Sequence, residues 1–139
     1  MRDRATPDAP VGPAVPAGLA EGPVWARRDP QLPSSVVWDD HVRFVVDLLL
    51  PDLIVGHSAG GFHDVVLTGP EGSRARHSPA GELVQIGPRR LWDEVESAHR
   101  RWQEWGSPHR ERFGLSATAH EQWVWLEDPR ERVTAIAGR

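Results

Sequence analysis

A serine between glycines lies in the pattern that serine hydrolases use for their nucleophile. Residues 56–60 read Gly-His-Ser-Ala-Gly, which matches the GxSxG nucleophile elbow with Ser58 at its centre. The elbow works because a strained turn from a strand into a helix exposes the serine oxygen at the helix N-terminus. Residues 53–55 predict the strand, but residues 62–68 predict a second strand where the helix should begin. We therefore favour a glycine-rich strand connection and keep a small serine hydrolase as an alternative.

Histidine and aspartate form a second group that could do chemistry. His57, His63, Asp64 and His77 lie in neighbouring predicted strands, and imidazole and carboxylate groups are ordinary ligands of zinc and iron. Their spacing matches no known ligand pattern. We interpret them as scattered histidines and predict no metal site, no catalytic residue and no cofactor in this chain.

Arginines and tryptophans are the remaining candidates. Arg89 and Arg90 begin a predicted helix, where the helix dipole disfavours cations, so that a bound anion or acidic peptide would explain them. The alternative is a solvated helix start with Arg90 paired to Glu94. Tryptophans at helical spacing are typical of a core, whereas Trp123 or Trp125 in a predicted strand could belong to a peptide-binding face.

Composition excludes several classes of function. The 139 residues contain no cysteine, which rules out thiol catalysis and iron–sulfur clusters, and all 16 basic residues are arginine, which rules out lysine Schiff-base chemistry. The net charge of −4 argues against general nucleic-acid binding. No apolar run approaches the roughly 20 residues of a membrane span. We expect a cytoplasmic protein with neither nucleic acid nor membrane as a partner.

The elements that position these residues predict an α+β fold. Asp39 or Asp40 can cap a first helix that ends at Pro51, and a second helix is predicted from Pro88 to Trp105. Strands at 53–55, 62–68, 73–77 and 83–86 predict an antiparallel meander, and 115–119 with 122–126 a hairpin. We expect a small antiparallel sheet, made of the meander and the C-terminal hairpin, packed against two principal helices.

Three regions follow from the same patterns. Residues 1–34 are rich in proline and alanine and predict a disordered tail, because they hold too few large apolar side chains to offset the entropy of ordering. Residues 35–129 predict the compact domain. Residues 130–139 are expected to fray.

Three separated motifs resemble one enzyme family. Residues 87–96 read Gly-Pro-Arg-Arg-Leu-Trp-Asp-Glu-Val-Glu, residues 112–115 read Arg-Phe-Gly-Leu, and residues 123–129 read Trp-Val-Trp-Leu-Glu-Asp-Pro. In this order and spacing they resemble the C-terminal region of actinobacterial protein-L-isoaspartate O-methyltransferase-like enzymes, which accompany ribosomally made peptides of the lanthipeptide and graspetide type. The resemblance covers about residues 36–129.

The resemblance implies a role beside methyl transfer to an aspartate-derived carboxylate. Family members bind the methyl donor in an N-terminal Rossmann-like domain, which residues 1–34 cannot replace, so no catalytic residue of the family carries over. The chain then resembles a non-catalytic accessory or substrate-engaging domain, whose partner is a precursor peptide or a methyltransferase catalytic domain that alone binds S-adenosylmethionine. A stand-alone interaction module remains a further alternative. The predicted peptide or anion contacts are Arg89, Arg90, Trp92, Arg112 and Trp123.

Overall fold

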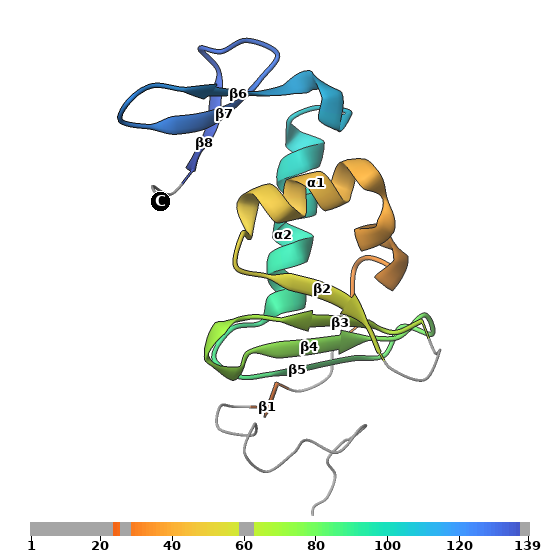
Figure 1. Ribbon diagram of the computed structural model, residues 1–139. Coiled ribbons are helices and arrows are strands. Elements are labelled where there is room, and N and C mark those ends of the chain that lie inside the picture. The colour runs from red at the N-terminus through yellow and green to blue at the C-terminus, as the bar shows by residue number, and fades with distance from the viewer. Residues whose placement is uncertain (1–23, 26–28, 59–62, 137–139) are drawn as a thin grey trace, which may run out of the picture. The chain divides into compact units, whose positions relative to one another are not determined.

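The protein has the α+β fold that the sequence predicts, and its described residues form two α-helices and two antiparallel sheets (Figure 1). The computed structural model describes residues 24–25, 29–58 and 63–136. The chain forms two compact units, which are described separately. The first contains the residues up to Val36 and Asp52–Glu96, and the second contains Val37–Pro51 and Ser97–Arg139.

The first unit is built on the predicted meander. Its strands are antiparallel neighbours in the order β1-β5-β4-β3-β2. The β3–β4 turn is the predicted one at 69–72, where Pro70–Gly72 form the short 3-10 helix η3. The strands are β1 (Val24–Trp25), β2 (Ile54–His57), β3 (Val65–Thr68), β4 (Arg74–His77) and β5 (Leu83–Ile86). The meander of β2 to β5 is therefore confirmed, with β1 as an added edge strand.

One face of this sheet is buried. Buried and half-buried residues alternate along β3, β4 and β5, as a period of two requires when one face covers a core. The first turns of α2 (Leu91–Glu104) contribute Leu91, Trp92 and Val95, which are fully buried. The Gln85 side chain joins strand to helix because its Oε1 accepts a hydrogen bond from the Trp92 backbone N–H, at 2.8 Å.

The second helix begins three residues later than the sequence predicts. Residues 87–90 form an irregular connection in which Gly87 has a φ of +99°. A Cβ there would lie 2.7 Å from Ser73 Cα, so only glycine fits this close approach between two segments. The Arg89 N–H donates to Ser73 Oγ at 3.1 Å, which ties this connection to the residue before β4.

The start of the compact domain also differs from the prediction. Before the 3-10 helix η2 (Ser34–Trp38), the backbone N–H groups of Gln31 and Leu32 donate to the buried Glu96 carboxylate. The Leu32 carbonyl lies 3.0 Å from the Nε2 of His77, which is also buried. Residues 31–34 thus belong to the folded unit, because buried polar groups depend on them. Most of the predicted tail lies outside the described residues.

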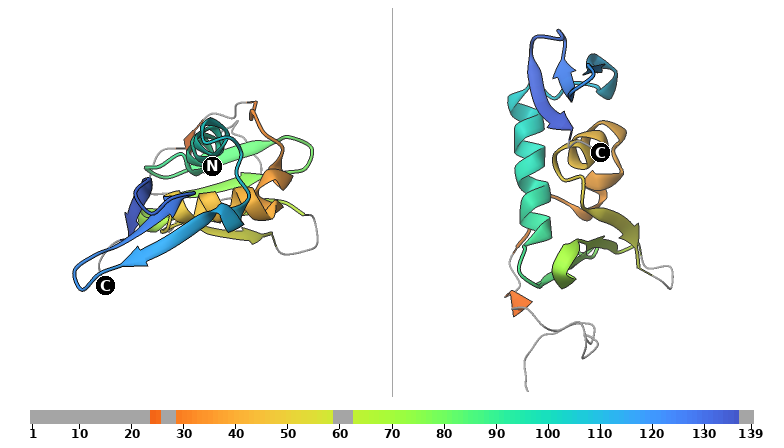
Figure 2. Two further views of the ribbon diagram at one scale, coloured as in Figure 1. Left: turned by 90° about the horizontal axis from the view of Figure 1, so that it is seen from above. Right: turned by 60° about the vertical axis from the view of Figure 1, so that its left-hand side comes forward.

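The second unit combines α1 (Asp40–Leu49), the C-terminal part of α2 and a three-stranded sheet (Figure 2). Asp39 is the N-cap of α1, as predicted, and its Oδ1 accepts from the N–H groups of His41 and Val42. The 3-10 helix η4 (Arg110–Arg112) leads into the sheet. Its strands are β6 (Phe113–Ala117), β7 (Gln122–Leu126) and β8 (Arg132–Ile136), in the order β6-β7-β8.

Two expectations about this region require correction. The predicted hairpin is present, but it belongs to a separate sheet rather than to the sheet of the meander. Residues 132–136, expected to fray, form β8, which pairs with β7 from Gln122 to Trp125. The second difference arises because β7 offers a second free edge, and pairing along that edge satisfies backbone groups that a frayed end would leave to water.

Candidate functional site

Arg89 is held by carboxylates of its own unit. Its Nη1 lies 2.7 Å from Asp52 Oδ2, and its Nε lies 3.0 Å from Glu94 Oε2. The hydrogen bonds that Arg89 donates to Glu94 and Asp52 raise the pKa of Arg89 above its ordinary value, and the one to Asp52 lowers the pKa of that carboxyl group below 3.8. This guanidinium is therefore already neutralised, which does not favour it as a contact for an external anion.

The other two predicted contacts of the first unit, Arg90 just before α2 and Trp92 within it, differ sharply in exposure. Arg90 is exposed, with its Nη1 3.8 Å from Asp93 Oδ2. Trp92 is fully buried: its Nε1 donates to Glu96 at 3.0 Å, and its ring meets His77 edge-on with the centroids 4.4 Å apart. Trp92 therefore serves the core, and its side chain offers no surface to a peptide.

Arg112 and Trp123 belong to the second unit. The Arg112 guanidinium forms an ion pair with Glu127, and the Arg112 carbonyl accepts from the Glu127 N–H at 3.0 Å. The Arg132 guanidinium lies over the Trp123 ring, with its Cζ 3.9 Å from the ring centroid. The Trp123 Nε1–H donates to the Pro129 carbonyl. Both side chains are thus fixed at the surface of the three-stranded sheet.

These two residues adjoin an open surface pocket of the second unit. Its volume is about 330 Å³, and its lining combines apolar surface with both signs of charge. Glu127 and Arg132, which Arg112 and Trp123 contact, are both part of the lining. The lining residues are Arg101, Trp105, Leu126, Glu127, Glu131, Arg132 and Val133.

Of the two arginines that line this pocket, Arg101 has less of its charge balanced by carboxylates of the protein. Its guanidinium lies over the Trp105 ring at 5.1 Å, and within the described part of the chain no carboxylate forms an ion pair with it. By contrast, Arg132 pairs with Glu121 at 3.1 Å. Arg101 is not among the contacts predicted from the sequence. The available signal was its spacing, since the residues four before and four after it are Ser97 and Trp105 rather than acids.

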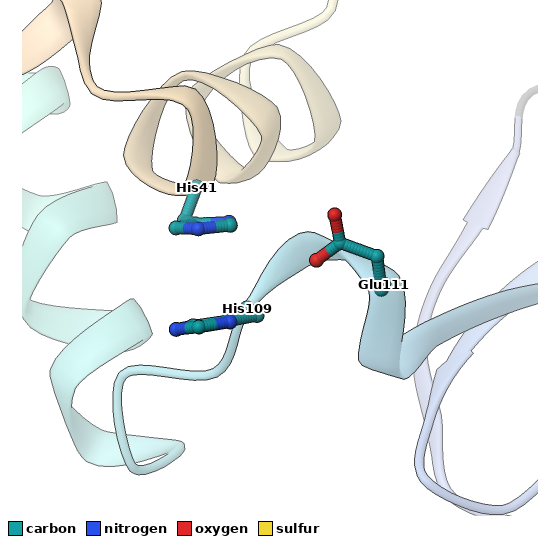
Figure 3. Close-up of side chains that lie close together, drawn as sticks. All are labelled: His41, His109 and Glu111. Atoms are coloured by element: carbon teal, nitrogen blue, oxygen red, sulfur yellow. The ribbon is translucent and has the colours of Figure 1, made fainter.

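A cluster of potential metal ligands lies elsewhere in the second unit, between α1 and η4 (Figure 3). His41, His109 and Glu111 each offer one ligand atom, and these three atoms lie within 4.8 Å of one another. The two imidazole rings are stacked with centroids 4.2 Å apart and planes 5° apart. His41 Nδ1 accepts a hydrogen bond from the Arg110 N–H at 3.0 Å. No metal was predicted here.

The histidines considered in the sequence are placed differently. His77 is buried, with hydrogen-bonding contacts to the Leu32 and Ser78 carbonyls, and Asp64 accepts from Arg76 Nε at 2.7 Å. In the part of the chain that the structure describes, they join no group of potential metal ligands. In the sequence, the cluster of His41, His109 and Glu111 is indicated only by the His-x-Glu spacing of the last two residues. His41 is distant in the chain and comes close to them only in the folded structure.

The described residues of the GxSxG motif, 56–58, lie at the end of a strand that pairs with the next strand of the chain. The first two residues of the motif, Gly56 and His57, end β2, and β2 pairs antiparallel with β3. The Ser58 N–H donates to the Asp64 carbonyl at 3.0 Å and so closes the connection between these strands. Residues 59–62 of the motif region lie outside the described residues. An elbow needs a turn from a strand into a helix to activate the serine, and the next element that the structure describes after Ser58 is strand β3.

Comparisons with known proteins give no further guide to the site. No protein-family model matches the chain. No curated protein and no solved structure matches it either. Within the described residues, no helix has both the length and the apolar character needed to cross a membrane.

Proposed function

We propose that this chain is a non-catalytic accessory domain that holds an acidic peptide for a separate methyltransferase. The three motifs that resemble the isoaspartate methyltransferase family support a role beside a methyltransferase. The pocket of the second unit supports the binding of an acidic peptide. In this proposal the chain acts in the cytoplasm, and S-adenosylmethionine binds to the separate catalytic domain. The observation that carries the proposal is the Arg101 guanidinium, which lies at the pocket over Trp105 without a carboxylate partner among the described residues.

The pocket suits a peptide carboxylate for two physical reasons. A guanidinium binds a carboxylate through charge-assisted hydrogen bonds, and a guanidinium stacked on an aromatic ring loses less side-chain freedom when it binds. The apolar side chains of Trp105, Leu126 and Val133 can cover the residues that flank that carboxylate. Arg112 and Trp123, predicted from the sequence as contacts, hold Glu127 and Arg132 in place at this pocket.

Calorimetric titration with matched peptides tests this proposal. We would titrate the full chain with a short synthetic peptide that carries one aspartate between aliphatic residues, and with the same peptide carrying asparagine. We expect the aspartate peptide to bind and the asparagine peptide to bind at least about tenfold more weakly, because a lost charge-assisted hydrogen bond costs about 1.5–3 kcal/mol. We expect no heat from S-adenosylmethionine.

A neighbouring arginine supplies the matched control. Arg101→Ala should abolish the preference for aspartate. Arg100→Ala removes an equally exposed arginine of the same helix, whose Nη2 donates to Ser97 Oγ, and should leave binding unchanged. Equal affinity for the two peptides, an Arg101→Ala variant that still discriminates between them, or binding of S-adenosylmethionine would each contradict the proposal.

A further inference from the structure

We infer that His41, His109 and Glu111 form a binding site for a divalent transition-metal ion, which would join the start of α1 to η4. Zn²⁺ is the ion that the site would take most readily under ordinary conditions. The three residues come from segments far apart in the chain and converge in the second unit, with Glu111 facing the two stacked rings (Figure 3).

The donor set determines the class of ion. Two imidazole nitrogens and one carboxylate oxygen suit Zn²⁺ and neighbouring transition metals, whereas Mg²⁺ and Ca²⁺ prefer oxygen ligands throughout. Three protein ligands leave at least one tetrahedral position open. Because His109 and Glu111 are exposed, solvent can fill that position. The site therefore resembles open zinc sites in its ligand number rather than closed structural ones.

One ligand atom of the cluster, His41 Nδ1, already accepts a hydrogen bond that a bound ion would displace. His41 is half-buried, and the Arg110 N–H that donates to its Nδ1 keeps a lone pair on that nitrogen in the neutral ring. An ion at Nδ1 would replace this amide as the partner of the lone pair. The cost is small because the displaced N–H lies at an exposed position and can bond to water instead.

The present geometry must close slightly around an ion. Ligand atoms bound to one tetrahedral zinc lie about 3.3–3.6 Å apart, since each is about 2.0–2.2 Å from the metal, and here they lie within 4.8 Å of one another. A coordinating lone pair lies in the plane of its ring, so one ion cannot serve two rings while they remain parallel. We therefore expect His109, which is exposed, to rotate out of the stack when the ion binds.

Titration of the full chain with metal tests the inference. The protein would carry no histidine tag and would be titrated at pH 8, where few protons compete for the ligands. We expect one Zn²⁺ per chain by calorimetry, and a visible absorption band when Co²⁺ replaces it. We also expect the imidazole proton resonances of His41 and His109 to shift together in NMR spectra, because opening the stack removes the ring current that each exerts on the other.

Three variants make the result decisive. His109→Ala and Glu111→Gln change exposed side chains, so both variants should fold, and each should weaken Zn²⁺ binding by more than about tenfold. His120→Ala removes an exposed histidine of the β6–β7 turn and should leave the affinity unchanged. The inference is wrong if Zn²⁺ does not bind, or if it binds equally well to His109→Ala and Glu111→Gln.

Discussion

Two arginines of the second helix region show that partners, rather than residue type, decide the role of a charge. Arg89 lies between Asp52 and Glu94 and is neutralised by both. Arg101 lies on an aromatic ring with no carboxylate partner in the described chain. A free guanidinium can compensate an incoming anion, whereas a paired one must first give up its own carboxylates. In the proposed function, Arg101 rather than Arg89 is therefore the residue that contacts the anion.

The Arg89–Asp52 pair predicts a measurable shift in titration. The pKa of the Asp52 carboxyl group should lie below its ordinary value of 3.8, chiefly because Arg89 donates a hydrogen bond to the ionised form. A lowered carboxyl pKa adds stability above the unfolded-state value, and that stability is lost as the pH falls through the folded-state pKa. NMR titration of the Asp52 side-chain carbon should show this low midpoint.

Arg89→Ala should return the Asp52 midpoint towards 3.8. Arg90→Ala provides the control, because Arg90 Nη1 lies near Asp93 rather than Asp52, and it should leave the midpoint unchanged. If the Asp52 midpoint is the same with and without Arg89, the ion pair does not persist in solution.

At the scale of elements, the β6–β7 hairpin depends on a glycine opposite a tryptophan. Gly114 pairs with Trp125 across the two strands, and the indole ring covers the glycine while its Nε1 donates to Ser116 Oγ at 3.0 Å. A Cβ added at Gly114 would overlap the ring of Trp125. The sequence predicts both strands, but only their register shows why residue 114 has no side chain.

Gly114→Ala should therefore lower the free energy of unfolding, by about 1–3 kcal/mol, because an added methyl group in a filled space forces the indole out of its rotamer. Chemical denaturation followed by tryptophan fluorescence measures this change. Gly56→Ala is the matched control in strand β2, since a Cβ there meets nothing within 4 Å and should cost little. Equal losses in both variants would contradict a specific role for the Gly114–Trp125 contact.

At the scale of the whole molecule, the segment before η2 completes the first unit. Glu96 and His77 are 3% and 1% exposed, and residues 31–32 supply partners to both. Glu96 lies one helical turn after Trp92, on the buried face of α2. The structure buries Glu96 because its carboxylate also accepts the Trp92 Nε1–H.

A chain that begins at residue 35 should be less stable than one that begins at residue 24. Removing residues 24–34 takes away β1 and leaves buried polar atoms of Glu96 and His77 without these partners. Each such loss costs about 1–3 kcal/mol. The midpoint of urea unfolding should fall accordingly, and equal midpoints for the two chains would show that the domain is complete from residue 35.

The sequence by itself determined the local elements. Apolar spacing, the Asp39 cap and the turn at 69–72 are encoded within a few residues, so α1, α2 and the strands from β2 to β7 could be located from pattern alone. Strand β8 was missed although three of its five residues are β-branched, because a segment so near the end of the sequence was expected to fray, and its pairing to β7 supplies the order. Absent cysteine and lysine also restricted the chemistry before any fold was known.

Only the tertiary structure decided which side chains meet. Residues that are distant in the chain meet in the cluster of His41, His109 and Glu111. The ion pair of Arg89 with Asp52 also joins distant residues. The same holds for the burial of Glu96 against residues 31–32. A local pattern fixes the period of a helix or strand, but a charge acquires its role from neighbours that long-range packing brings within a few ångströms.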